Sequence, residues 1–400
     1  MLFRSMVVAP VRRRRTTRVA SAVRNDLVDG FARRYPFPLD QFQLEAMQAL
    51  SADRSVLVAA PTGTGKTVIA EFGVELARSK GMRAIYTAPI KALSNQKFHD
   101  WRATYGDSVG LLTGDVTENA SGDVLVMTTE VLRNMVLRNP EAFGDTAVVI
   151  FDEVHFLADP DRGTTWEEAI LNCPPHVQLV CLSATVSNAA EIARWIGRVH
   201  RETVLVEHST RAVPIDHLYI HDDRIWPLVD ATGRLHEPLR VGGEARTPRP
   251  MGMGRGARPK ELPRPRDVLG ILGENQMLPV IYFLFGRRAC EVAGASCDRL
   301  DLGGDAVTRR RRTERVRQTM EALGPEDRTL AQVRDLTRLL ERGMAFHHAG
   351  VLPVLKQLVE GLFSEGLLGA VFATETLALG VNMPARSVVI AEHTKYDGVS

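Results

Sequence analysis

The feature that most constrains this chain is the glycine-rich segment at residues 60–67, which reads Ala-Pro-Thr-Gly-Thr-Gly-Lys-Thr. An apolar, β-branched run precedes it at residues 56–58, and an apolar helical pattern begins at Val68. A strand, a glycine-rich turn and a helix in this order form a phosphate-binding loop, where backbone N–H groups and the helix N-terminus surround an anion. Ala60 departs from the usual pattern, because a glycine normally stands first. We call residues 60–67 the phosphate loop and predict that it binds a nucleotide.

The polar side chains of the phosphate loop have separate expected tasks. Lys66 is expected to reach the outer phosphates, and the hydroxyl of Thr67 to ligate Mg²⁺. The remaining candidate ATP-binding residues of the loop are Thr62, Gly63, Thr64 and Gly65. An ordinary glycine-rich turn is the alternative, but the Lys-Thr pair and the flanking elements favour phosphate binding.

Short apolar strands alternate with helical patterns after the phosphate loop. The expected strands are 83–88, 110–112, 124–128, 147–151 and 178–182, and the expected helices are 68–79, 93–105, 129–137, 165–172 and 188–197. Strands that are apolar throughout indicate a parallel sheet covered on both faces, so the fold class is α/β. In such sheets ligands bind beyond the carboxyl ends of the strands.

Two carboxylates, Asp152 and Glu153, follow the expected strand 147–151. An acid at a strand exit can hold Mg²⁺ opposite Thr67, and an adjacent glutamate can orient and activate the attacking water. Lys66, Asp152 and Glu153 are therefore the candidate catalytic residues. A solvated turn would be the default interpretation of two such acids without the phosphate loop upstream. Ser183 and Thr185 end the next strand, where a helix N-cap is the alternative.

Composition limits the setting in which the chain works. No apolar run approaches the roughly 18 residues of a membrane span, which excludes a membrane protein. The four cysteines show no Cys-x-x-Cys spacing, so we expect buried thiols in a reducing cytoplasm and neither zinc nor disulfides. The net charge of +2 is unevenly distributed, because residues 1–25 carry seven arginines and no acid.

The middle of the chain changes character. Residues 227–281 contain no Phe, Trp or Tyr, and Pro and Gly cluster from 233 to 265. This composition predicts a flexible basic connector. A second α/β unit is expected to begin with the apolar strand 279–285. The arginine-rich stretch at 309–317 is either a nucleic-acid face or a solvated helix.

Further motifs follow the phosphate loop in a fixed order. They are Thr-Ala-Pro-Ile-Lys-Ala-Leu-Ser-Asn-Gln-Lys at 87–97, Leu-Thr-Gly-Asp at 112–115, Met-Thr-Thr-Glu-Val-Leu at 127–132, Ala-Phe-His-His-Ala-Gly at 345–350 and Val-Phe-Ala-Thr-Glu-Thr-Leu-Ala-Leu-Gly-Val-Asn-Met-Pro at 371–384. From Phe37 onward the chain resembles the superfamily-two DExH-box helicases, specifically their Ski-two-like group. The resemblance implies an ATP-dependent helicase or translocase with two RecA-like parallel-sheet domains. Its partner would be single-stranded nucleic acid, RNA favoured over DNA, within an RNA-decay or processing assembly.

The resemblance also implies residue roles. Phe37 and Gln43 would contact the nucleotide base, and the Gln43 amide can both donate and accept. Gly380 and Asn382 would face the nucleotide from the second domain. The residues expected to contact the nucleic-acid backbone are Pro89, Lys91, Ala92, Thr113, Gly114, Thr128 and Thr374. The residues expected to couple the two sites are His155, Ser183 and Thr185.

The expected organisation has four parts: a basic leader at 1–30, an ATP-binding RecA-like domain at 31–210, a connector at 211–271 and a second RecA-like domain at 272–400. The family's next motif, a glutamine and then Gly-Arg-x-Gly-Arg, would follow the strand at 387–392. The chain ends at Ser400 before it, so we expect the second domain to be incomplete. Because those arginines neutralise charge on the transferred phosphoryl group, a second hypothesis remains: an ATP- and nucleic-acid-binding module with little turnover.

Overall fold

The computed structural model describes residues 26–160, 162–211, 213–221, 223–229, 233–235, 263–374, 377 and 383–391. These residues form two compact units that divide after Pro214. No helix of the described residues is long and apolar enough to cross a membrane.

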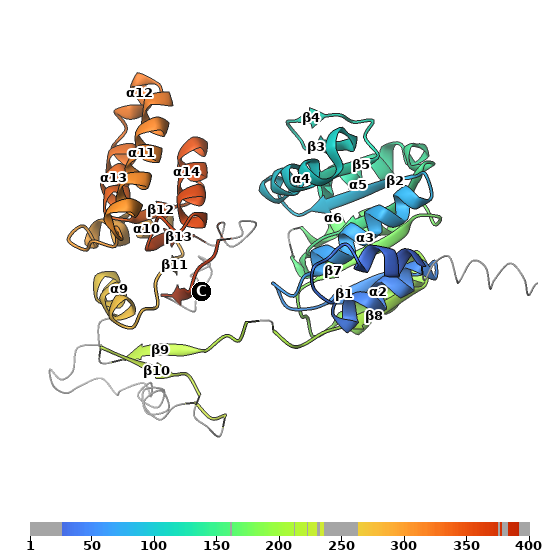
Figure 1. Cartoon of the computed structure of the whole chain (residues 1–400), viewed down its shortest axis with the longest axis horizontal. Helices are drawn as coiled ribbons and strands as arrows, with labels where there is room; N and C mark the ends of the chain where they lie inside the picture. Colours follow the sequence, from blue (N-terminus) through green and yellow to red (C-terminus); the bar gives the residue numbers. More distant parts are fainter. Residues whose placement is uncertain are drawn as a thin grey trace, which may run out of the picture. The chain divides into compact units, whose positions relative to one another are not determined.

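The first unit is built on an eight-stranded sheet with the order β4-β3-β5-β2-β6-β7-β1-β8 (Figure 1). In chain order the strands are β1 Ser55–Ala59, β2 Arg83–Ala88, β3 Val109–Leu112, β4 Thr117–Glu118, β5 Val124–Thr128, β6 Thr146–Phe151, β7 Gln178–Ser183 and β8 Thr203–Glu207. All neighbouring strands are parallel except β3 and β4. The predicted α/β class with a parallel sheet is confirmed.

Helices cover both faces of this sheet (Figure 1). One set comprises α2 Gln41–Ser51, α3 Lys66–Ser79 and α4 Lys91–Tyr105, and the other α5 Thr129–Arg138, α6 Gly163–Asn172 and α7 Ala189–Val199. Successive strand residues point to opposite faces, so Val56 and Val58 join one core and Leu57 the other. All five residues of β1 and of β5 are buried, which explains why these strands are apolar except for Ser55 at the start of β1 and Thr128 at the end of β5. Three 3₁₀ turns complete the unit: η1 Gly106–Ser108, η2 Pro140–Phe143 and η3 Val154–Ala158.

The second unit contains a four-stranded parallel sheet with the order β12-β13-β11-β14. Its strands are β11 Val280–Phe283, β12 Met344–His347, β13 Ala370–Ala373 and β14 Ser387–Ile390. Its helices are α9 Pro265–Glu274, α10 Arg287–Ser296, α11 Ala306–Ala322, α12 Pro325–Arg328, α13 Ala331–Glu341 and α14 Pro353–Ser364. The unit therefore has the parallel sheet and flanking helices expected of a second RecA-like domain.

The segment expected to be a flexible connector is partly ordered. An antiparallel hairpin of β9 Leu218–His221 and β10 Arg224–Pro227 packs Ile220 and Ile225 against the core of the second unit. Helix α9 also lies there, across the expected boundary at 271, and buries Val268, Leu269 and Leu272. The absence of Phe, Trp and Tyr from residues 227–281 does not rule out ordered structure there, because aliphatic side chains suffice to anchor the ten-residue helix α9. Most of the Gly/Pro/Arg-rich insertion and the leader to residue 25 lie outside the described residues.

The arginine-rich stretch 309–317 lies on α11, and its charges are largely used within the unit. Arg309 pairs with Asp301 at 2.8 Å, and Arg317 contacts two glutamates of its own helix. Arg312 is 1% exposed and donates to the carbonyls of Gly303, Leu367 and Glu341 at 2.8, 2.9 and 3.0 Å. These contacts favour a packed and solvated helix over a nucleic-acid face.

Candidate active site

The carboxyl edge of the eight-stranded sheet brings the predicted site residues into two neighbouring groups. Strands β6, β7 and β1 are adjacent and lead into Asp152 and Glu153, into Ser183 and into the phosphate loop. Strands β3, β5 and β2 are also adjacent and lead into residues 113–114, 128 and 89–92, which we call the nucleic-acid segments. The two groups meet where β2 pairs with β6.

The phosphate loop is folded around its own lysine. Lys66 Nζ donates to the carbonyls of Ala60 at 2.7 Å and Pro61 at 3.1 Å. The buried hydroxyl of Thr64 also donates to Pro61, at 2.7 Å. Gly63 and Gly65 have φ angles of +83° and +80°, which glycine adopts without strain. The side chain of Thr64 thus has an internal structural contact, whereas Thr62 and Thr67 are exposed.

Gln43 contacts the phosphate loop directly. Its Oε1 accepts from the Asp40 N–H at 2.9 Å in the capping box of α2, and its Nε2 donates to the Gly65 carbonyl at 3.0 Å. A Cβ added to Gly65 would lie 2.7 Å from this Nε2. Gln43 therefore braces the loop, and its predicted contact with a base remains a prediction. Phe37 is 53% exposed beside Tyr35, with ring centroids 5.5 Å apart, and its surface is free to stack on a base.

The Asp152 carboxylate is held from two sides. The fully buried Tyr86 of β2 donates its hydroxyl to Asp152 Oδ2, and the Glu153 N–H donates to Oδ1 at 3.0 Å. Glu153 itself has a φ of +54°, a left-handed conformation that is costly for a glutamate and turns the chain sharply into η3. His155 Nδ1 lies 3.3 Å from Glu153 Oε2.

Burial dominates the electrostatics of these groups. It raises the pKa of Glu153 to about 7, with a further increase from Asp152 that Lys66 partly offsets. Burial also lowers the pKa of Lys66, against the pull of both carboxylates, and lowers that of His155. A carboxyl with a pKa near neutrality suits general-base work on water. Ser183 is 1% exposed, and its hydroxyl has no hydrogen-bond partner among the described residues.

The donor set fits a hard divalent cation. Asp152 offers a carboxylate directly after β6, and Thr67 offers a hydroxyl in the first turn of α3, the helix that follows β1 two strands away. No cluster of three or more His, Cys, Asp or Glu side chains suited to a metal occurs in the part of the chain described. Mg²⁺ is typically held by one or two protein oxygens together with water and substrate phosphates. The residues present therefore fit a magnesium ion that arrives with its nucleotide.

The nucleic-acid segments present small residues and one cation. Lys91 Nζ pairs with Asp115 Oδ1 at 3.0 Å, and the Thr113 hydroxyl donates to the same oxygen at 2.9 Å. Ala92 and Gly114 are exposed. The Lys91 pair pulls the pKa of Asp115 below its ordinary value.

The other predicted backbone contacts lie at strand ends too. Thr128 is buried at the start of α5. In the second unit, Thr374 follows β13, and its N–H donates to the His347 carbonyl at 3.3 Å. The predicted nucleotide contacts Gly380 and Asn382 lie outside the described residues.

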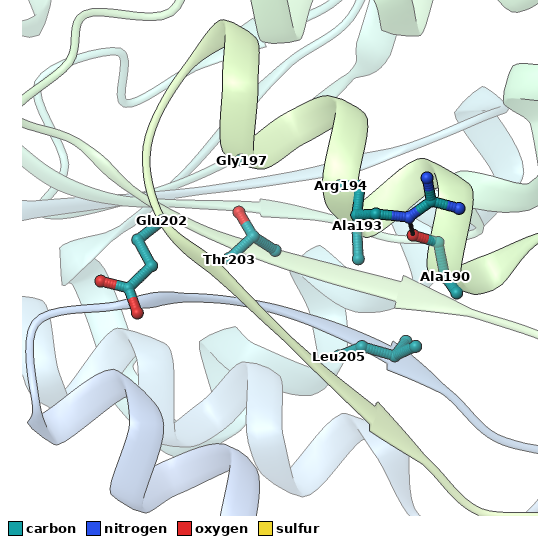
Figure 2. A pocket seen from close by; sticks show the side chains of 7 residues that line it. All are labelled: Ala190, Ala193, Arg194, Gly197, Glu202, Thr203 and Leu205. Atoms are coloured by element: carbon teal, nitrogen blue, oxygen red, sulfur yellow. Dashed lines mark hydrogen bonds between the residues drawn. The ribbon is translucent and has the colours of Figure 1, made fainter.

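An open groove of about 440 Å³ lies between α7 and the edge strand β8 (Figure 2). Its lining residues are Ala190, Ala193, Arg194, Gly197, Glu202, Thr203 and Leu205. None of them belongs to the predicted site. The candidate site is therefore defined by strand ends and loop chemistry rather than by this groove.

Comparison with known proteins identifies the first unit. Residues 40–192 match the family described as DEAD/DEAH box helicase. This region belongs to the DEAD/DEAH box helicase family.

The similarity to individual proteins extends over both units. Mouse (Mus musculus) "Exosome RNA helicase MTR4" is 42% identical over 383 residues, covering 92% of this chain and 36% of the relative. "Probable helicase HelY" of Mycobacterium tuberculosis (strain ATCC 25618 / H37Rv) is 43% identical over 389 residues, covering 93% and 43%. Human (Homo sapiens) "Superkiller complex protein 2" is 41% identical over 387 residues, covering 91% and 30%. The predicted resemblance to Ski-two-like helicases is confirmed, and the chain spans less than half the length of these relatives.

Two polar residues at the site were not predicted from the sequence. Tyr86 lies within a buried strand and Arg162 in a loop after η3, and neither belongs to a recognisable motif. Their partners, Asp152 for Tyr86 and Pro89 with Glu130 for Arg162, are brought together by the pairing of β2 with its neighbours β5 and β6. Only the strand order could have revealed them.

Proposed function

We propose that this chain is the ATP-hydrolysing part of a helicase or translocase that moves on a single nucleic-acid strand, RNA in preference to DNA. The observation that carries the proposal is the layout of one sheet edge. The phosphate loop and the carboxylate pair lie on three adjacent strands, and the nucleic-acid segments lie on the next three. In a translocase, the ATP site must be structurally coupled to the nucleic-acid site. Adjacent strands of one sheet would provide that coupling.

Each site residue has a role in the proposed hydrolysis. The N–H groups of the phosphate loop would cradle the phosphates of ATP, and Lys66 would exchange its two loop carbonyls for phosphate oxygens. Glu153 would orient the attacking water and accept its proton, which its pKa of about 7 favours. Thr67 and Asp152 would hold Mg²⁺, which supplies charge neutralisation at the phosphoryl oxygens when bound.

We propose that His155, Ser183 and Thr185 couple the nucleotide site to the nucleic-acid site. His155 contacts Glu153, and the Ser183 hydroxyl at the end of β7, the strand between β6 and β1, has no hydrogen-bond partner within the described ranges. Thr185 lies two residues further on and is exposed. These three residues would link nucleotide binding to nucleic-acid binding, for which Thr374 of the second unit is a proposed backbone contact.

RNA is the proposed substrate because one of the similar proteins is named an exosome RNA helicase. A second similar protein is named as part of a superkiller complex. By this similarity we also propose an RNA-decay or processing assembly as the partner. The four free cysteines are all buried, which agrees with a reducing cytoplasm.

ATP hydrolysis by residues 1–400, measured with and without single-stranded RNA or DNA, tests the proposal. RNA should stimulate turnover, and Glu153→Gln should lower it by about 10²–10⁴ while retaining ATP binding, because only the general base is lost. Lys66→Ala should weaken ATP binding itself. Binding of ATP and RNA with no turnover would support the alternative, a binding module. Failure to bind either ligand at low salt would refute both.

A further inference from the structure

Arg162 lies at the N-terminus of α6 and makes contacts that the proposed function does not use. Its Nη2 donates both to the carbonyl of Pro89 and to Glu130 Oε1, the latter at 2.8 Å. Its guanidinium lies over two aromatic rings, Phe156 and Trp166, at 5.7 Å from each centroid. The two rings are themselves stacked, with centroids 5.6 Å apart and planes at 15°. The side chain is therefore fixed in plane and position.

The partners of Arg162 belong to different parts of the site. Pro89 follows β2 and begins the nucleic-acid segment that contains Lys91. Glu130 stands in the first turn of α5, two residues after Thr128. Phe156 lies in η3, which starts immediately after Glu153. One side chain thus ties the nucleic-acid segment 89–92 and the helix that follows Thr128 to η3, which begins directly after Asp152 and Glu153.

A neighbouring ion pair shows what an ordinary link between α5 and α6 looks like. Arg133 and Glu168 join the same two helices at 3.6 Å, and the Arg133 side chain is 32% exposed, the same fraction as Arg162. Arg133 also pairs with a carboxylate, but its hydrogen bonds within the described part of the chain go to the exposed Asn134 on its own helix. Arg162 differs by its carbonyl acceptor in a nucleic-acid segment and by its aromatic platform.

We propose that Arg162 is a positioning residue that couples nucleic-acid binding to the carboxylate loop. A movement of residues 89–92 on binding a phosphate backbone would shift the Pro89 carbonyl, and the guanidinium would carry that shift to η3 through the stacked rings. Coupling between two sites is reciprocal, so nucleotide should change the affinity for RNA by the same factor as RNA changes the affinity for nucleotide. The inference rests on the proposed function.

The test compares the full chain with Arg162→Gln, Arg162→Lys and the matched control Arg133→Gln. Fluorescence anisotropy gives the Kd for labelled single-stranded RNA with and without a non-hydrolysable ATP analogue and Mg²⁺, and the ratio of the two values is the coupling factor. Typical coupling factors are about 5–150. We expect Arg162→Gln to bring the factor close to one while the Kd for the analogue alone changes less than about twofold. Arg162→Lys should be intermediate, since lysine keeps the charge and loses the planar stacking.

The outcomes separate the two proposals. If the native chain binds both ligands and Arg162→Gln keeps the native coupling factor, or Arg133→Gln lowers it equally, the role of Arg162 is refuted and the proposed function stands. A native chain that binds both ligands without coupling also refutes it. If the native chain binds neither ligand, the proposed function fails and the inference with it.

Discussion

Glu153→Gln should stabilise the metal-free first unit at neutral and alkaline pH. Burial raises the pKa of Glu153 from 4.5 to about 7 in the folded chain, and its side chain is only 30% exposed. Holding this carboxylate ionised in the folded state therefore costs about 3 kcal/mol relative to the unfolded chain, at roughly 1.4 kcal/mol per pKa unit. Glutamine has a similar shape and carries no charge, so the variant avoids this cost.

The sign of the pH dependence follows from which state loses its proton first. Below pH 4.5 the carboxyl is protonated in both states, and the two proteins should differ little. Between pH 4.5 and about 7 the unfolded native chain ionises while the folded chain does not, so native stability falls as the pH rises. Above pH 7 the difference should level off near its maximum.

Urea titration in EDTA, followed by tryptophan fluorescence at about pH 5, 6, 7 and 8, measures this difference. The signal reports mainly on the first unit, because Trp101, Trp166 and Trp195 lie there and only Trp226 lies beyond Pro214. Glu141→Gln, at an exposed glutamate, is the matched control and should show no such trend. A stability difference that stays constant from pH 5 to 8, or a Glu153→Gln variant that is the less stable protein at pH 8, would refute the reasoning.

Three further predictions test other contacts. Gly65→Ala should cost about 1–3 kcal/mol and exceed Gly63→Ala, because both have positive φ but only the first meets a side chain; equal thermal shifts would contradict this. Tyr86→Phe should raise the Mg²⁺ concentration needed to bind a fluorescent ATP analogue by about tenfold, since the Asp152 carboxylate loses an orienting donor; an unchanged Mg²⁺ titration would argue against that role. Arg312→Met should destabilise the second unit by about 3 kcal/mol by leaving three carbonyls without their donor, and hydrogen exchange in α13 that matches the native chain would count against it.

The strands of the first sheet could be predicted closely because burial on both faces selects an unbroken apolar run. Strands β2 and β5 have the predicted limits, 83–88 and 124–128. The edge strand β8 was missed, since three of its five residues are only partly buried and the surrounding sequence is polar. The hairpin of β9 and β10 was missed because its strands pair only with each other and contribute few residues to a core.

In the candidate site, too, features set by neighbouring residues could be predicted, whereas contacts between residues distant in the sequence could not. The phosphate loop, Asp152 and Glu153 are each encoded within a few consecutive residues, so local sequence patterns are enough to propose them as site residues. The side-chain hydrogen bonds of Gln43 to the phosphate loop, of Tyr86 to Asp152 and of Arg162 to Pro89 and Glu130 join residues between 21 and 73 positions apart. Those contacts depend on which strands are neighbours, and no local pattern specifies strand order.

The carbonyls of Ala60 and Pro61 accept hydrogen bonds from the Lys66 ammonium and would therefore compete with nucleotide phosphates for it. Because these carbonyls belong to the same chain, their effective concentration near Lys66 is constant. They would therefore lower the affinity of every nucleotide that must displace them by the same factor. A ligand whose phosphates do not reach Lys66 escapes that penalty. With Lys66 bound to the outer phosphates as proposed, this competition would reduce the difference in affinity between nucleotides with longer and shorter phosphate chains. The same carbonyls would accept hydrogen bonds from the ammonium again after the outermost phosphate has left.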